Sequence, residues 1–317
     1  MDNVKDNAKR EDNTSSGGFC RGLGGSNGGF CCGSGERLGG GLSGKYPLTG
    51  RENHPENTVV KVGNATIGDG EFDFIAGPCA VESEKQIIET ATALKKSGVK
   101  ILRGGAYKPR TSPYSFQGLG KEGLKFLRKA KEETGLAVVT EITDLRTLDL
   151  FDGVDMIQIG ARNMQNFELL KEVGKFGKPV LLKRGFVNTV EEWLMSAEYI
   201  ASNGVFDIVL CERGVRTFET LTRNTLDLGI IPLVKELTRL PVIIDPSHAS
   251  GNKKLIRPLT LAAAAVGADG AIIECCVSPE NAVCDGEQAI TPEELKEIIS
   301  AAAKVKEAAE KNGEASR

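Results

Sequence analysis

Eight short apolar runs alternate with helical segments between residue 72 and about residue 310, and this alternation constrains the fold more than any other feature. Such runs are typical of strands that are buried in a parallel sheet. The predicted strands are Phe72–Ala76, Val99–Leu102, Ala137–Thr140, Met156–Ile159, Val180–Lys183, Ile208–Cys211, Val242–Asp245 and Ala271–Glu274. Eight strand–helix units in about 240 residues favour an α/β fold of the (β/α)8 TIM-barrel type over an open doubly wound sheet.

Three capping boxes predict where helices begin. They are Ser83 to Gln86, Thr189 to Glu192, and Thr291 to Glu294, the last with a proline at the first helical position. The helix after the sixth strand is the least clearly marked, because residues 213–224 have the composition of a loop.

The first 57 residues differ from the rest of the chain. They contain 14 of the 38 glycines and show no hydrophobic periodicity, so we expect residues 1–57 to be a disordered Gly-rich tail. Cys20, Cys31 and Cys32 in this block form no CxxC pair. The expected catalytic domain covers residues 58–317. It begins with a short β-hairpin at residues 58–70, signalled by a Gly-Asn turn and expected to cover the bottom of the barrel.

Charge and composition exclude several classes of function. The formal net charge is −3, which gives no electrostatic support for nucleic-acid binding. No apolar run reaches the roughly 18 residues of a membrane helix, and the first residues resemble neither a secretory signal nor a transit peptide. The eight cysteines have the spacing of neither a disulfide framework nor a zinc finger. We therefore expect a cytoplasmic protein.

Polar or metal-binding groups follow every predicted strand, at the end where a barrel places its active site. In strand order these groups are Cys79, Arg103, Glu141, Gln158 with Arg162, Lys183 with Arg184, Glu212 with Arg213, Asp245 with His248, and Glu274. Because all eight strand ends meet at one rim, we expect these side chains to share a site.

The cations at this rim predict an anionic substrate. The second strand runs into Leu102–Pro113, a loop that contains glycines, prolines, hydroxyls and three cations. The cations of the whole rim are Arg103, Lys108, Arg110, Arg162, Lys183 and Arg213. Such a set suits one or two phosphates and a carboxylate.

A second group at the rim has the chemistry of a metal site. Cys79, His248, Glu274 and Asp285 would supply a thiolate, an imidazole and two carboxylates. We expect one divalent ion there. Mn, Fe, Co and Zn all fit this mixture of soft and hard ligands, so the donor set does not select among them.

The motifs at the strand ends also resemble a known family. They are AGPCAVES (Ala76–Ser83), LRGGAYKPRTSPYSFQGLG (Leu102–Gly120), TEI (Thr140–Ile142), QIGARNMQN (Gln158–Asn166), LLKRG (Leu181–Gly185), CERGVRTFE (Cys211–Glu219), DPSHASG (Asp245–Gly251) and DGEQAIT (Asp285–Thr291). Over residues 58 to 310 the chain is similar to the type I (beta subgroup) 3-deoxy-D-arabino-heptulosonate 7-phosphate (DAHP) synthases. The resemblance implies a metal-dependent barrel that condenses phosphoenolpyruvate with erythrose 4-phosphate, the first step of the shikimate pathway to aromatic amino acids.

The resemblance assigns roles to matching positions. Phosphoenolpyruvate would be bound by Arg103, Gly160, Ala161, Arg162, Lys183 and Arg213, and erythrose 4-phosphate by Lys108, Pro109, Arg110 and Thr111. Cys79, His248, Glu274 and Asp285 would be the metal ligands. Lys183, Glu141 and His248 are the candidates for proton transfer, and the sequence does not rank them. The family resemblance further implies a homo-oligomer, a dimer or a tetramer.

Two alternatives stay open from the sequence. One is a 3-deoxy-octulosonate 8-phosphate synthase or a related enzyme that condenses phosphoenolpyruvate with an aldose. Those relatives carry a KANRSS motif where this chain has Lys108-Pro109-Arg110-Thr111-Ser112, which favours the four-carbon aldose. The other alternative is a non-catalytic phosphosugar-binding barrel, although all four metal-ligand positions are filled in this chain.

Overall fold

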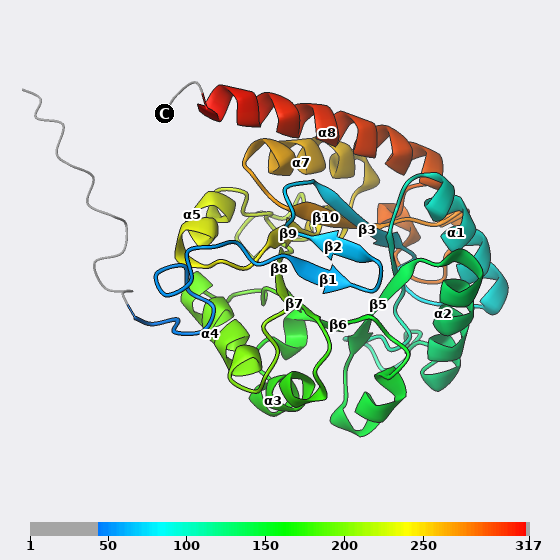
Figure 1. Ribbon diagram of the computed structural model, residues 1–317. Helices are drawn as coiled ribbons and strands as arrows, with labels where there is room; N and C mark the ends of the chain where they lie inside the picture. The colour runs from blue at the N-terminus through cyan, green and yellow to red at the C-terminus, as the bar shows by residue number, and fades with distance from the viewer. Residues whose placement is uncertain (1–43, 315–317) are drawn as a thin grey trace, which may run out of the picture. The chain divides into compact units, whose positions relative to one another are not determined.

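Eight parallel strands form a closed barrel in the computed structural model, which describes residues 44–314 (Figure 1). The strands are β3 (Asp73–Gly77), β4 (Ile101–Arg103), β5 (Ala137–Ile142), β6 (Met156–Ile159), β7 (Val180–Lys183), β8 (Ile208–Glu212), β9 (Val242–Ile244) and β10 (Gly270–Glu274). They pair in chain order, and β10 closes the barrel against β3. The predicted (β/α)8 fold is confirmed, and each predicted strand overlaps an observed one.

Helices surround the barrel and bury their apolar faces against it. They are α1 (Glu84–Lys96), α2 (Lys121–Thr134), α3 (Phe167–Phe176), α4 (Val190–Ala201), α5 (Ile230–Leu237), α6 (Pro246–Ser250), α7 (Lys253–Ala265) and α8 (Pro292–Glu314). Short 3-10 helices complete the connections: η1 (Leu145–Phe151), η2 (Ala161–Asn163), η3 (Pro279–Asn281) and η4 (Gly286–Gln288). Between β5 and β6 the connection is η1 instead of an α-helix. Trp193 and Phe151 are fully buried between the helices and the strands.

The helix starts agree with the predicted capping boxes, with one difference. Thr189 and Glu192 exchange both bonds of the box at α4, and Thr291 and Glu294 do so at α8. At α1, Ser83 accepts the bond from the Gln86 amide, but the Gln86 side chain accepts instead from the amide of Glu82. The box at α1 is therefore only half formed.

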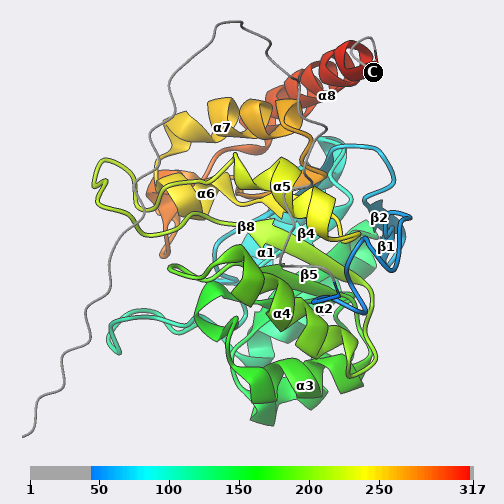
Figure 2. The same ribbon diagram turned by 90° about the vertical axis from the view of Figure 1, so that its left-hand side faces the viewer.

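The connection after β8 is a long loop, as its composition predicted. Residues 213–229 precede α5, and a single bridge between Val215 and Thr225 folds the loop back on itself. This loop and the loop after β4 project from the same end of the barrel, opposite the hairpin (Figure 2).

A two-stranded hairpin closes the other end of the barrel. Its strands β1 (Val60–Val62) and β2 (Ala65–Ile67) pair in antiparallel fashion across the predicted turn. Four apolar side chains of the hairpin, Val60, Val62, Ala65 and Ile67, pack with the residues that fill the barrel interior. Gly63 in the turn adopts a φ of 58°, a conformation that favours glycine. The predicted hairpin and its place at the bottom of the barrel agree with the structure (Figure 1).

Residues 44–57 correct the prediction of a disordered tail that reaches residue 57. Tyr46 and Thr49 are buried, and the carboxylate of Glu198 on α4 accepts from the amide and the hydroxyl of Thr49, each at 2.7 Å. The Arg51 guanidinium donates to the carbonyl of Lys235 at the end of α5. Isolated contacts of this kind produce no hydrophobic periodicity in the sequence. Periodicity therefore did not predict an ordered segment here. Residues 1–43, with Cys20, Cys31 and Cys32, lie outside the described residues.

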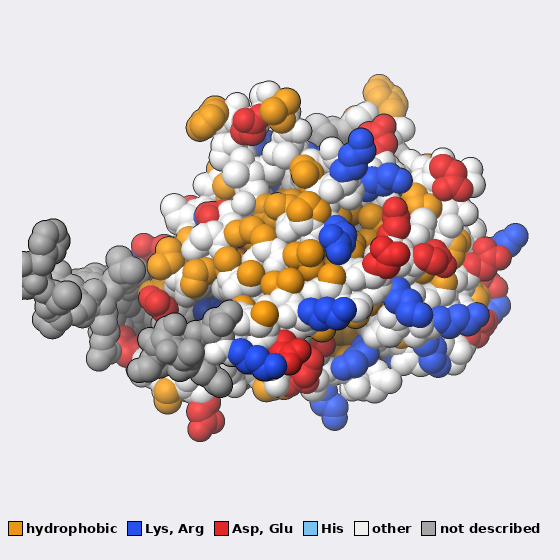
Figure 3. All heavy atoms as spheres, turned by 90° about the horizontal axis from the view of Figure 1, so that it is seen from above, with side chains coloured by type: hydrophobic (Ala, Val, Ile, Leu, Met, Phe, Trp, Pro, Cys, Tyr) orange, Lys and Arg blue, Asp and Glu red, His pale blue; other side chains and the backbone are white. Residues whose placement is uncertain are grey.

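One face of the barrel is covered by α7 and α8, and apolar side chains gather on its surface (Figure 3). Exposed apolar residues here are Pro258 and Ala265 on α7, Val266 directly after α7, and Ala303 on α8. Across residues 44–314, no helix combines the length and the apolar character that a membrane span requires.

Candidate active site

A cavity of about 430 Å³ opens at the C-terminal ends of the strands. Its lining includes most of the residues that the sequence assigned to the site: Arg103, Lys108, Pro109, Arg110, Thr111, Glu141, Gly160, Ala161, Arg162, Lys183, Arg213, His248 and Asp285. The remaining two, Cys79 and Glu274, are buried next to lining residues that they contact. The structure therefore brings the predicted site residues together from all eight strand ends and one later loop.

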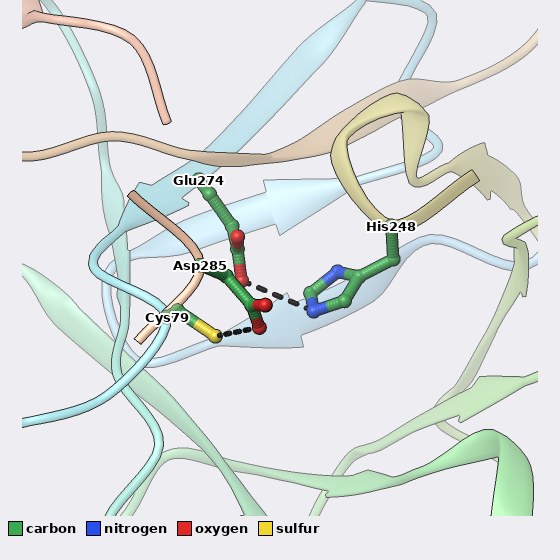
Figure 4. A group of neighbouring side chains, drawn as sticks. All are labelled: Cys79, His248, Glu274 and Asp285. Carbon is green, nitrogen blue, oxygen red and sulfur yellow. Dashed lines mark hydrogen bonds and ion pairs between the residues drawn. The ribbon is translucent and has the colours of Figure 1, made fainter. Parts of the chain in front are cut away.

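Four potential metal ligands converge beside this cavity (Figure 4). Cys79 follows β3, His248 lies on α6 just after β9, Glu274 ends β10, and Asp285 lies in the loop before η4. One ligand atom from each side chain lies within 4.8 Å of all the others. The Cys79 Sγ is 3.1 Å from Asp285 Oδ2, and His248 Nε2 is 3.0 Å from Glu274 Oε1. A single ion could contact all four.

Asp285 is held in an unusual backbone conformation. With φ 55° and ψ 32°, it is the one non-glycine residue among residues 44–314 that has a positive φ. An L-residue pays a conformational cost there, and such conformations persist where surrounding contacts impose them. The consequence is that the Asp285 carboxylate faces Cys79, although the residue lies well beyond the end of β10.

Asp245 orients the histidine of this cluster. Its carboxylate accepts from the amide of His248 at 2.9 Å and lies 2.7 Å from Nδ1, which leaves Nε2 directed at Glu274. Metal-binding histidines commonly use a carboxylate in this way. Burial by itself would lower the pKa of His248. The carboxylates of Asp245 and Glu274 have the larger opposite effect, so the pKa rises to about 10. The imidazole thus lies between two buried carboxylates.

Glu274 is fixed from two further sides. It is fully buried, and it accepts from Arg103 Nη1 at 3.1 Å and from the Gln288 side-chain amide at 2.5 Å. Gln288 was not singled out from the sequence. It belongs to the DGEQAIT motif, three residues after Asp285, so the motif contained the signal.

The loop after β4 places Lys108 and Arg110 against the same cluster. Lys108 Nζ lies 2.8 Å from the Cys79 Sγ and 3.1 Å from the Cys79 carbonyl oxygen. Burial by itself would lower the pKa of Lys108. Cys79 and Glu274 have the larger opposite effect and raise the pKa to about 12, so the ammonium stays charged. Arg110 Nη1 lies 2.7 Å from the Cys284 Sγ and 3.8 Å from Asp285.

The opposite wall is formed by the ends of β5 and β6. The Gln158 side chain donates to Glu141 Oε2 at 3.1 Å and so orients that carboxylate. A Cβ at Gly160 would lie 1.9 Å from Glu141 Oε1, so only glycine allows this close approach. Gly160 and Ala161 line the cavity next to this carboxylate.

Three arginines in the cavity surround one aromatic ring. The Cζ atoms of Arg162, Arg213 and Arg216 lie 5.3, 4.6 and 4.8 Å from the centroid of Phe186. The sequence analysis missed Phe186 and Arg216, together with Arg223 and Asn224, which also line the cavity. Phe186 directly follows the LLKRG motif and Arg216 lies within CERGVRTFE, but neither is at a strand end.

Two of the polar groups expected at the rim do not face the cavity. Arg184 and Glu212 are buried and pair with each other at 2.9 Å. Successive residues at the end of a strand point to opposite sides, so Arg184 points away from the side that Lys183 occupies. Lys183 lines the cavity and pairs with Asp245.

Residues 53–311 match the sequence profile of the DAHP synthetase I family. The chain is 53% identical over 264 residues to the phospho-2-dehydro-3-deoxyheptonate aldolase of Thermotoga maritima, with 83% of this chain and 78% of the relative covered. A 2-dehydro-3-deoxyphosphooctonate aldolase of Francisella tularensis subsp. holarctica is 31% identical over 264 residues, which cover 76% of this chain and 94% of the relative.

Two solved structures agree with this result. The crystal structure of the Thermotoga maritima aldolase (DAHP synthase) matches with a TM-score of 0.80 at 53% identity, over 83% of this chain and 77% of the other. A truncated form of 3-deoxy-D-arabino-heptulosonate 7-phosphate synthase from Thermotoga maritima matches with a TM-score of 0.78 at 48% identity, over 84% of this chain and 98% of the other.

Proposed function

We propose that this chain, which belongs to the DAHP synthetase I family, is a 3-deoxy-7-phosphoheptulonate synthase. It condenses phosphoenolpyruvate with D-erythrose 4-phosphate and water, gives DAHP and phosphate, and so catalyses the first step of the shikimate pathway. The observation that carries the proposal is the cavity in which cations from several strand ends meet beside the Cys79, His248, Glu274 and Asp285 cluster. The higher identity to the heptonate enzyme than to the octonate enzyme favours the four-carbon aldose.

Phosphoenolpyruvate is assigned to the cations around β4, β6, β7 and β8. Arg103, Arg162, Lys183 and Arg213 would bind its phosphate and carboxylate, with the backbone of Gly160 and Ala161. Guanidinium groups form paired hydrogen bonds with both kinds of anion. Because the two substrates are both anionic, this positive lining also overcomes their repulsion and holds them close together.

Erythrose 4-phosphate is assigned to the loop after β4. Lys108, Pro109, Arg110 and Thr111 line the same cavity, next to the cluster that contains Asp285. In this arrangement the aldehyde end of the aldose would lie near the cluster, and its phosphate would contact Arg110 and Thr111.

The four-residue cluster fits a divalent metal ion. A thiolate, an imidazole and two carboxylates are suitable ligands for Mn, Fe, Co or Zn, and Asp245 and Gln288 already orient two of them. A metal bound there would act as a Lewis acid on the aldehyde oxygen.

Three side chains in the cavity are proposed to move protons. C3 of phosphoenolpyruvate attacks the aldehyde carbon, water adds at C2, and the resulting hemiketal phosphate releases phosphate. The new alkoxide takes a proton and the attacking water loses one. Lys183 Nζ and Glu141 line the cavity and would exchange these protons, and His248 would do so only when its Nε2 is not a metal ligand.

We also propose that the protein forms a homo-oligomer, either a dimer or a tetramer. Its proposed location is the cytoplasm. The apolar surface over α7 and α8 supports the oligomer, because contiguous exposed apolar patches are typical of protein interfaces (Figure 3).

A paired aldose assay tests the proposed reaction. Metal-replete protein should consume phosphoenolpyruvate and release phosphate with erythrose 4-phosphate, and much more slowly with arabinose 5-phosphate. A chelator should abolish both activities. Preference for arabinose 5-phosphate would assign the chain to octulosonate synthesis, and no phosphate release with any aldose phosphate would favour a non-catalytic phosphosugar-binding barrel.

A further inference from the structure

The cations of the cavity differ in whether a carboxylate neutralises them. Arg103 pairs with Glu274, Lys183 with Asp245, and both Arg110 and Arg223 with Asp285. Within residues 44–314, Arg162, Arg213 and Arg216 have no carboxylate at ion-pair distance. They are also the three arginines that surround Phe186.

An aromatic ring can hold cations without cancelling their charge. The face of the Phe186 ring attracts guanidinium groups through its quadrupole. A carboxylate in the same place would occupy the N–H donors that an incoming anion needs. The ring therefore leaves the positive charge of the arginines uncancelled, although Arg213 also donates to the carbonyls of Gly214 and His248 and Arg162 donates to the Thr111 hydroxyl.

Two of the segments that carry these residues, the loops after β7 and β8, are tied to each other. The Arg216 amide donates to the Phe186 carbonyl at 2.7 Å. Arg184 and Glu212, the immediate neighbours of Gly185 and Arg213, form the buried ion pair described above, and Glu212 also accepts from the Gly214 amide at 2.7 Å. These contacts join the loop after β7, which carries Phe186, to the loop after β8, which carries Arg213 and Arg216, so the ring keeps its position relative to these two arginines.

We propose that Phe186 is a positioning residue that holds Arg162, Arg213 and Arg216 as one phosphate site, and that Arg216 is a third guanidinium of this site. This inference rests on the proposed function, in which Arg162 and Arg213 bind phosphoenolpyruvate. It adds a residue that supplies no charge and an arginine that lies outside the strand ends. The bound group is the phosphate of phosphoenolpyruvate, because these arginines lie beside Lys183 and the Gly160–Ala161 backbone in the cavity lining.

The test uses the full-length, metal-replete protein and separates the two substrates. Phe186→Leu removes the ring, Phe186→Tyr keeps it, and Arg216→Ala removes the third guanidinium. Phe167→Leu, which removes one ring of the surface pair with Tyr199, and Arg128→Ala on α2 are the matched controls. The readouts are kcat, the KM of each substrate, and the constant for competitive inhibition by inorganic phosphate against phosphoenolpyruvate.

We expect Phe186→Leu and Arg216→Ala each to raise the KM for phosphoenolpyruvate about tenfold. The phosphate inhibition constant should rise in parallel, whereas kcat and the KM for erythrose 4-phosphate should change less than about twofold. Phe186→Tyr should stay close to the unmodified protein, because it keeps the ring face.

Equal increases in both KM values, a defect confined to kcat, or the same defect in Phe186→Tyr would overturn the proposal. If the unmodified protein turned over no phosphoenolpyruvate, the proposed function would fail by itself. Direct calorimetric titration with inorganic phosphate would then decide the inference: weaker binding in Phe186→Leu and Arg216→Ala supports the phosphate site, and unchanged binding contradicts it.

Discussion

The two ends of the barrel are built from the same eight strands but bury opposite kinds of side chain. At the end that the hairpin closes, Val60, Val62 and Ile67 are fully buried among aliphatic residues. At the other end, Asp245 and Glu274 are fully buried as charged groups, held by Lys183, His248 and Arg103. Apolar burial stabilises the fold, whereas a buried ion pair often contributes little net stability.

The comparison teaches that stability and activity are separated along the barrel axis. The cations and the potential metal ligands of the cavity are all at the cavity end. Their proposed role is to bind the substrates and a metal ion. Changes at the hairpin end should therefore alter stability with little effect on catalysis, and changes at the cavity end should do the reverse.

The largest expected effect is at the cavity end. His248→Ala should lower kcat about a thousandfold or more, because it removes one of the proposed metal ligands and leaves the aldehyde without its electrophilic partner. Metal content measured by mass spectrometry should fall. His54→Ala, at the other histidine of the chain, is the matched control. Retention of activity within tenfold of the unmodified protein would show that the cluster is not needed.

The next effect is at the hairpin end. Ile67 is fully buried in the barrel interior, so Ile67→Ala should lower the free energy of unfolding by about 3 kcal/mol, measured by urea denaturation. Both KM values and kcat should stay within about twofold of the unmodified protein at a temperature where the variant is folded. The half-exposed Val59→Ala should cost less than about 0.5 kcal/mol. A large loss of kcat in Ile67→Ala would mean that the two ends are coupled.

The smallest effect is a pH dependence that comes from the hairpin end. Asp73 begins β3, and burial together with the nearby Asp69 raises its pKa to about 7, although Lys100 and Lys306 partly oppose the shift. Its unfolded pKa is about 3.9, so the folded protein binds more protons between these values, and this contribution to stability is lost as pH rises.

Between about pH 5 and pH 8, this carboxyl should account for a loss of about 2 kcal/mol of unfolding free energy. Asp73→Asn should remove that part of the dependence and leave the pH profile of kcat unchanged. The exposed Asp152→Asn is the control. Parallel stability profiles for the unmodified protein and Asp73→Asn, measured by urea denaturation across this range, would contradict the assignment.

Much of the fold and the floor of the site could be predicted from local patterns. The alternation of apolar runs and helices predicted the closed barrel, because strand and helix periods are properties of neighbouring residues. The rule that barrel sites lie at the C-terminal strand ends then brought Arg103, Lys183 and Glu274 to one place. Asp285 lies beyond any strand end, and only its motif linked it to the cluster before the structure placed it beside Cys79.

Other features were decided by contacts between segments that are distant in sequence. Lys183 and Arg184 are adjacent cations, yet one faces the cavity and the other pairs with Glu212. Residues 44–57 are held in place because the Glu198 carboxylate on α4 accepts a hydrogen bond from the Thr49 amide. The ring of Phe186 meets arginines from two different loops only after the barrel closes.

The sequence by itself determined the strands and the helices, since their periods are local. The direction of each rim side chain and the path of each loop depended on tertiary packing, because their partners come from other strands.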